Sequence, residues 1–169
     1  MAFIIWKIFT EEWLKRAERG EGERVDDADR FISLWIAFNG WMKGKFGERK
    51  RDTMLLNETK TLAEFNNSFN HLKQDDSDFR KNLKKLANYS VGNMQRPEQG
   101  ERKYDGTLDS LIEILYRVRC NLFHGRKEIN GNAKDKDLVS LSLKILLPLF
   151  KTYLSMNKPK EQTNAKRRS

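Results

Sequence analysis

Apolar residues recur at intervals of three and four positions through most of the chain, which is the period of an amphipathic helix. The first such set is Trp6, Phe9, Trp13 and Ala17. It predicts an N-terminal helix in which Thr10 is the N-cap, while Phe9 and Leu14 form a hydrophobic staple. Gly20 and Gly22 are expected to end this helix.

A second helix is predicted over residues 26–41 and is our candidate for the centre of the fold. Its middle, residues 31–38, is apolar nearly all the way round, as expected for a helix that is buried on all sides. Gly40 weakens its end. Residues 43–56 hold five cations and two glycines and are interpreted as a basic, mobile connection. The alternative for this segment is a loop whose charges only keep it solvated.

Two shorter amphipathic helices are predicted next. The third helix carries the apolar set Leu62, Phe65, Phe69 and Leu72. The fourth carries Phe79, Leu83 and Leu86. Asn57 is expected to cap the third, and the fourth begins after the acidic cluster at residues 75–78. Residues 92–106 then form a long excursion with Pro97, of a length that is either functional or flexible.

Two further helices complete the pattern. The fifth is predicted over residues 107–124, with Thr107 as its N-cap and Gly125 directly after its end. Its apolar stripe is Leu111, Leu115, Val118 and Leu122. The last helix is predicted over residues 135–156, and Pro148 is expected to kink it or to break it into two pieces.

These elements predict an all-α fold, a bundle of about five to six helices. No segment alternates between apolar and polar residues as a strand does, and no internal repeat is present. The length of 169 residues suits one domain, to which we assign residues 1–157. Residues 158–169 are expected to form a flexible, disordered basic tail.

Charge and cysteine content narrow the class of protein. The net charge is +9, and the predicted tail holds five of the cations and one acid, which leaves about +5 for the domain. This balance favours anionic partners. Cys120 is the only cysteine, so an intramolecular disulfide and a zinc cluster built on cysteines are excluded. The apolar start at residues 1–9 is short and interrupted by Lys7, so we expect a cytoplasmic protein with no membrane partner.

The chain lacks the signatures of several enzyme classes. It has no phosphate-binding P-loop, no H-E-x-x-H zinc motif and no G-x-S-x-G nucleophile motif, and no metal or other cofactor is expected. Of the two histidines, His71 has no second candidate ligand or base beside it and is assigned to a structural or surface role. The other, His124, ends the fifth helix.

The residues before His124 share a polar stripe on the fifth helix. Arg117, Asn121 and His124 are spaced i, i+4 and i+7, whereas Arg119 is displaced from His124 by about 140° around the helix. A single chain therefore need not bring Arg119 onto His124. A structural alternative is that these side chains only meet the free carbonyls at the helix C-terminus. The bare Arg-x4-6-His spacing is also common by chance, so the surrounding residues must supply the specificity.

The stretch from Arg117 to Lys127 resembles the Arg-x4-6-His segment of the HEPN superfamily, including its position at a helix end. Residues 30–39 are similar to the long second helix of bacterial HEPN-like proteins, and the resemblance covers residues 25–155. The strict form of the motif has a polar residue directly after the Arg, where this chain has Cys120 and then Asn121.

This resemblance implies a helical bundle that dimerises around the motif, so that two Arg/His sets line one cleft. It also implies metal-independent cleavage of RNA, often in toxin–antitoxin, phage-defence or CRISPR-linked systems. An antitoxin or effector protein is then a candidate partner. On this match Arg119 and His124 are the catalytic pair, and Arg117 is an alternative start of the motif.

RNA cleavage without a metal needs a group that takes the proton of the attacking 2′-hydroxyl and a group that stabilises charge on the phosphate. Histidine can do the first, and the two-pronged guanidinium of arginine can do the second. We therefore expect His124 as general acid or base and Arg119 as phosphate clamp. The expected substrate-positioning residues are Arg117, Asn121, Arg126 and Lys127. The product would be a 2′,3′-cyclic phosphate.

Two alternatives stay open. The first is a non-catalytic HEPN-like module that binds RNA or dimerises, in which Arg119 and His124 serve only for phosphate contact or helix capping. The second is a helical interaction protein with no nucleic-acid role, for instance a subunit of a defence or regulatory complex.

Overall fold

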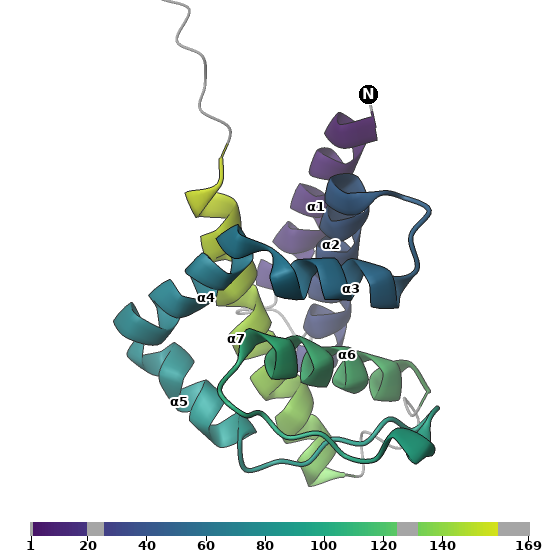
Figure 1. The fold of residues 1–169 in the computed structure, drawn as a ribbon, viewed down its shortest axis with the longest axis vertical. Helices are drawn as coiled ribbons and strands as arrows, with labels where there is room; N and C mark the ends of the chain where they lie inside the picture. Colours follow the sequence, from purple (N-terminus) through teal and green to yellow (C-terminus); the bar gives the residue numbers. More distant parts are fainter. Residues whose placement is uncertain (1, 20–25, 125–131, 159–169) are drawn as a thin grey trace, which may run out of the picture.

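The apolar helix predicted near residue 30 forms the centre of the fold. In the computed structural model, which describes residues 2–19, 26–124 and 132–158, it is helix α2, Asp27–Phe46 (Figure 1). The Asp26 side chain caps it by accepting from the backbone N–H of Asp29 at 2.9 Å. Gly40, which was expected to weaken the end of the helix, lies inside it and is buried. Helix α2 ends five residues after its predicted end at Trp41.

Helix α1, Ala2–Glu18, packs along α2 over two glycines. A Cβ atom added at Gly40 would lie 2.6 Å from Cδ1 of Phe9, and one at Gly44 would lie 2.7 Å from Cβ of Trp6. This close approach requires glycine at both positions. The predicted N-cap at Thr10 is wrong, because the contacts of Trp6 and Phe9 with α2 extend the helix to Ala2 and leave Thr10 buried in its interior.

The predicted third helix is in fact two helices. Helix α3 is Asp52–Thr61 and helix α4 is Ala63–Asp75, and they meet at Leu62, which has an extended backbone with φ −71° and ψ 116°. Asn57 lies inside α3, so its predicted capping role is wrong. The supposed basic connection 43–56 is also wrong, because only five of its residues lie outside α2 and α3. This raises the number of α-helices in the described residues to seven.

Of the remaining helices, one starts after its predicted cap at Thr107, and another starts within the acidic cluster 75–78 rather than after it. Helix α5, Ser77–Leu86, is capped by Asp76, and helix α6, Leu108–His124, is capped by Thr107, whose Oγ1 accepts from the backbone N–H of Ser110 at 3.1 Å. Helix α7, Ala133–Met156, starts two residues before its predicted beginning and contains Pro148 without a break. Of the two predicted effects of Pro148, the break into two pieces is therefore wrong, and the kink stays a prediction.

Helix α7 crosses the middle of the bundle and contacts α2, α4, α5 and α6. Aromatic rings join it to its neighbours: the ring centres of Trp41 and Tyr153 are 4.8 Å apart, and those of Phe38 and Phe150 are 5.3 Å apart. By length and composition α7 could cross a membrane, and it is the one described helix that could. Because 56% of its apolar window is buried inside the bundle, we interpret it as a core helix.

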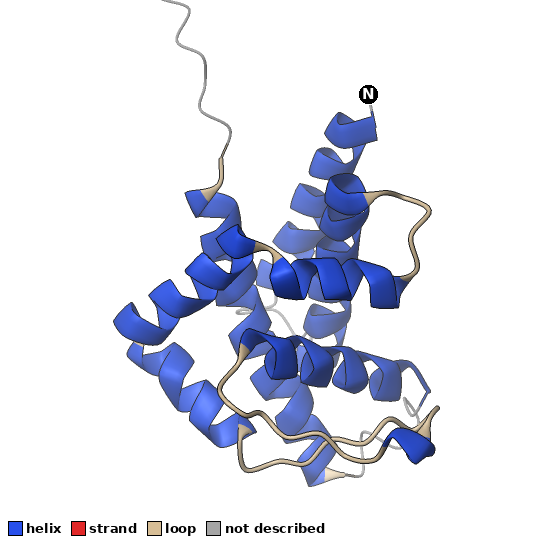
Figure 2. Cartoon of the chain, viewed as in Figure 1, coloured by secondary structure: helices blue, strands red, loops and turns tan. Residues whose placement is uncertain are grey.

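The segment between α5 and α6 is a long loop that runs beside α6 (Figure 2). It contains a single turn of 3₁₀ helix, Pro97–Gln99, and one antiparallel bridge in which the backbones of Val91 and Arg102 exchange hydrogen bonds of 2.9 Å. The described residues form no β-strand beyond this bridge, which confirms the all-α fold class.

Candidate functional site

The polar stripe of α6 binds the long loop. Arg117, which is only 5% exposed, donates from Nη1 to the carbonyls of Val91 at 3.0 Å and Gly100 at 2.7 Å. Its Nε donates to a carboxylate oxygen of Glu113 at 3.2 Å. This arginine is therefore occupied by its own chain and fixes both ends of the loop segment 91–100.

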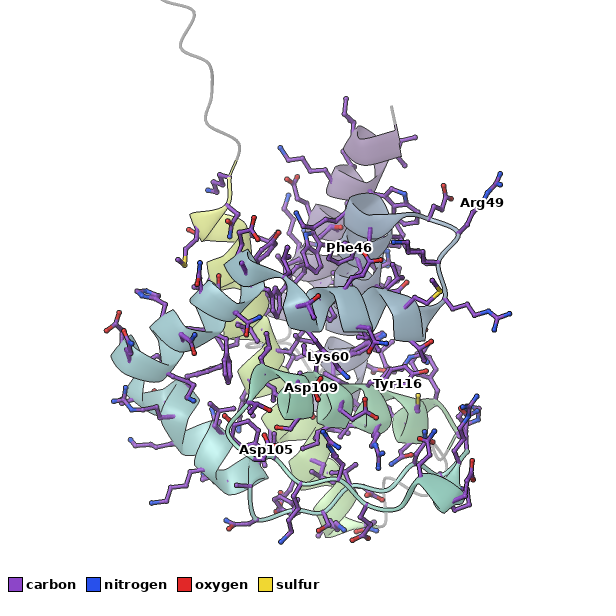
Figure 3. All side chains as sticks on the ribbon, in the orientation of Figure 1. Phe46, Arg49, Lys60, Asp105, Asp109 and Tyr116 are labelled. Carbon is purple, nitrogen blue, oxygen red and sulfur yellow. The ribbon has the colours of Figure 1, made fainter. Side chains whose placement is uncertain are left out.

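Glu113 in turn connects α6 to α3. Lys60 lies 3.3 Å from the Glu113 carboxylate and 3.5 Å from that of Asp109, and Figure 3 shows Lys60 and Asp109 between the two helices. Burial raises the pKa of Glu113, but the hydrogen bond from Arg117 and the charge of Lys60 outweigh it, so the pKa of this carboxyl lies below its usual value. The group is therefore ionised at neutral pH and completes the pairing of Arg117.

Asn121 and His124 continue the attachment of the loop. The Asn121 side chain donates to the carbonyl of Gly92 and accepts from the backbone N–H of Met94, both at 3.0 Å. His124 is exposed at the end of α6, where its Nε2 contacts the side-chain amide nitrogen of Gln95. Arg117, Asn121 and His124 therefore share one stripe of α6, as predicted, and the long loop covers that stripe.

Arg119 lies on a different side of α6, where it faces α3. Its Nη2 is 3.8 Å from a carboxylate oxygen of Asp52, and its Cζ is 4.8 Å from the centre of the Phe123 ring. Asp52 also accepts a hydrogen bond of 3.1 Å from Asn39. The Nε atom of Arg119 is buried and has no partner among the described residues. Its Nη1 donates to Sγ of Cys120 at 3.9 Å, so Nε is the one nitrogen of this guanidinium without a partner in the described chain.

A tyrosine and a tryptophan close the site around Arg119. Burial, with a contribution from Cys120 and Asp52, raises the pKa of Tyr116 to about 12, so its hydroxyl stays neutral at physiological pH. The ring of Trp35 lies 6.2 Å from that of Tyr116, and its indole N–H is buried with no partner in the described part of the chain. The Arg119 side of α6 is thus an amphipathic, partly buried polar cluster.

The structure does not bring the two predicted catalytic residues together within one chain. Arg119 contacts α3 whereas His124 contacts the loop, as their angular separation on the helix predicted. Arg126 and Lys127, and with them Gly125, lie outside the described residues. His71 lies on the surface of α4, as predicted, but the expectation that no base lies beside it is wrong, because its Nδ1 is 3.0 Å from a carboxylate oxygen of Asp75.

Sequence reasoning missed the partners of the predicted site residues. Asp52 belonged to a segment that was interpreted as a basic connection, and Gln95 lies in a loop where no spacing pattern places a side chain. Among the described residues, no group of three or more His, Cys, Asp or Glu side chains is arranged to hold a metal ion. Comparisons with protein-family models, with curated proteins and with solved structures find no match for this chain.

Proposed function

We propose that this protein is a metal-independent endoribonuclease of the HEPN type that cleaves single-stranded RNA. The observation that carries the proposal is the pairing, on one helix, of an exposed histidine at the C-terminal end with an arginine that is partly exposed and incompletely paired. His124 is accessible to a substrate, and the Arg119 side chain is 28% exposed while its Nε has no partner in the described chain. The net charge of +9 agrees with a polyanionic substrate.

The chemistry needs no group beyond these two types. The imidazole of His124 takes the proton of a ribose 2′-hydroxyl, and the resulting oxygen attacks the adjacent phosphorus. The bond from phosphorus to the 5′-oxygen breaks, and that oxygen receives a proton from a protonated histidine. The guanidinium of Arg119 stabilises the negative charge that collects on the phosphate oxygens. The products are a 2′,3′-cyclic phosphate and a free 5′-hydroxyl.

In a homodimer, the two chains together supply both Arg119 and His124 to one site. Because Arg119 and His124 face different sides of α6, we propose that His124 of one chain acts with Arg119 of a second copy. A two-fold axis near the end of α6 then generates two equivalent sites. In this proposal the protein acts in the cytoplasm as a toxin or phage-defence component, and an antitoxin or effector protein restrains it.

Incubation of the purified protein with mixed single-stranded RNA in EDTA tests the proposal. We expect fragments with cyclic-phosphate ends from the wild type, no cleavage by His124→Ala, and a dimer mass in solution. His71→Ala removes the other histidine and serves as the matched control, which should cleave normally. Absence of cleavage by a folded, dimeric wild-type protein would contradict the proposal.

The hydrogen bonds of the α6 stripe favour one second candidate, a non-catalytic module that binds RNA or dimerises. In this reading Arg117, Asn121 and His124 serve to hold the loop 91–100. RNA binding without cleavage, unchanged in His124→Ala, would identify it.

The exposed apolar residues Ile4, Ile5 and Ile8 of α1, each more than half exposed, instead favour a helical interaction protein. A protein that binds no RNA at low salt would support this last alternative.

A further inference from the structure

A groove on another part of the molecule carries an unbalanced positive charge. It has a volume of ≈ 490 Å³ and lies between the N-terminal part of α2, helix α5 and the middle of α7. Its cations come from all three helices and are Arg30, Lys81, Lys85 and Lys144. Asp78 is the one carboxylate among the residues that line it. The lining therefore has an excess of three positive charges.

The four cations differ in how completely nearby acids and carbonyls pair with them. Arg30 is largely buried, donates from Nε to the carbonyl of Ala17 at 2.9 Å and lies 3.6 Å from Asp27. Lys81 lies 3.6 Å from Asp78, but both side chains are more than 70% exposed, so this pair is weak. Lys85 and Lys144 form no ion pair or hydrogen bond with the described residues. An anion in the groove would relieve their mutual repulsion.

The floor of the groove adds two further properties. Leu143, Leu147 and Pro148 of α7 provide an apolar surface beside the cations. Because Pro148 has no N–H, the carbonyl of Lys144, four residues earlier, loses its usual helical partner. A carbonyl without its usual helical donor, beside an apolar surface, suits a ligand that carries a hydroxyl or an amine on an organic body.

We propose that this groove binds a small ligand with two or more phosphate groups. Convergence of cations from three helices around a concavity favours a compact anion, whereas a long polyanion would need cations in a row along the surface. The volume lies in the range of about 300–1,000 Å³ that is usual for small-molecule sites. The diphosphate contacts the lysines, and an organic body, where the ligand has one, lies against Leu147 and Pro148. The proposal does not depend on RNA cleavage.

Calorimetric titration of the full chain with inorganic pyrophosphate and with ADP tests this site. Lys85→Ala/Lys144→Ala should weaken the binding of both probes at least tenfold. Lys84→Ala/Lys136→Ala removes the same charge from the same two helices outside the groove and should change binding less than twofold. Equal losses in the two double variants would overturn the proposal, because they would show that only general surface charge is involved. If neither pyrophosphate nor ADP binds at millimolar concentration, the proposal is overturned as well.

Pro148→Ala tests the role of the Lys144 carbonyl, since alanine restores the N–H of position 148 that usually bonds it. This variant should bind pyrophosphate as the wild type does and should bind ADP several-fold more weakly, which would assign an organic diphosphate to the groove. Equal binding of both probes by the wild type would instead assign inorganic diphosphate. Displacement of ADP by single-stranded RNA, with an RNA affinity that is higher and depends on Lys85 and Lys144, would overturn the small-ligand proposal in favour of an RNA track.

Discussion

At the residue scale, two arginines of α6 that are only two positions apart have opposite surroundings. Arg117 is almost completely buried, and its guanidinium is matched by Glu113 and two loop carbonyls. A buried cation is tolerated because its hydrogen bonds and its counter-charge replace the lost water. Arg119 is partly exposed, has one distant carboxylate and keeps an unpartnered Nε in the described chain. Arg117 is therefore a structural residue, whereas Arg119 is the more exposed and less completely paired of the two arginines.

Replacement of Arg117 should accordingly destabilise the protein. Arg117→Met keeps most of the side-chain volume but leaves Glu113 and the carbonyls of Val91 and Gly100 without their donor. We expect a loss of about 3 kcal/mol in the free energy of unfolding, measured by urea denaturation. Arg119→Ala is the matched control and should cost less than about 1 kcal/mol, since its ion pair is weak. Unchanged stability of Arg117→Met would contradict the structural role.

At the element scale, periodicity predicts where helices exist, and tertiary contacts decide where they end. The caps at Asp76 and Thr107 act through side chains within three residues. The sequence predicted the cap at Thr107, but it placed Asp76 only within an acidic cluster that precedes a helix. The start of α1 depends on Gly40 and Gly44, which are distant in sequence, and no local pattern reveals this. The break at Leu62 separates two helices whose apolar residues follow one continuous period, which is why a single helix was predicted.

The contact between α1 and α2 gives a prediction about stability. Alanine at Gly40 improves helix propensity but places a Cβ atom 2.6 Å from the Phe9 ring. We expect overpacking to dominate, so that Gly40→Ala lowers the free energy of unfolding by about 1–3 kcal/mol. Gly92→Ala is the control, because nothing lies within 4 Å of its added Cβ, and its effect should be near zero. A stabilised Gly40→Ala protein would mean that α1 does not pack closely on α2.

The N-terminus of α6 gives a prediction about pH. Hydrogen bonds from Ser110 and Thr107 lower the pKa of Asp105 from 3.8 to about 2. A carboxyl whose pKa is lowered in the folded protein stabilises the fold at pH values above its ordinary pKa of 3.8. This contribution is lost as the pH falls through the lowered pKa of about 2. Asp105→Asn should therefore have a lower Tm than the wild type at pH 7, and the difference should disappear near pH 2. Glu98→Gln, at an exposed acid of the neighbouring loop, should show no such dependence, and a pH-independent difference would contradict the assignment.

At the scale of the whole molecule, the proposed site is incomplete in one chain. The sequence predicted that Arg117, Asn121 and His124 share a stripe, because that follows from helix geometry alone. It did not predict that a loop of the same chain occupies this stripe, because no periodic pattern relates residues 91–100 to α6. The placement of Arg119 against Asp52 was equally hidden, since it depends on the packing of α3 on α6. An active arrangement therefore requires either release of the loop or a second chain.

Mixing of two inactive variants separates these possibilities. If each site combines His124 of one chain with Arg119 of another, then Arg119→Ala and His124→Ala homodimers are both inactive, and a heterodimer of the two regains one intact site. When equal amounts of the two variants exchange subunits at random, half of the dimers are heterodimers, and each heterodimer has one intact site and one inactive site. The mixture should therefore recover about a quarter of the wild-type cleavage rate. Mass spectrometry confirms that exchange has occurred. A mixture that contains heterodimers and stays inactive would show that both residues must act from the same chain, in which case cleavage would require movement of the loop away from His124.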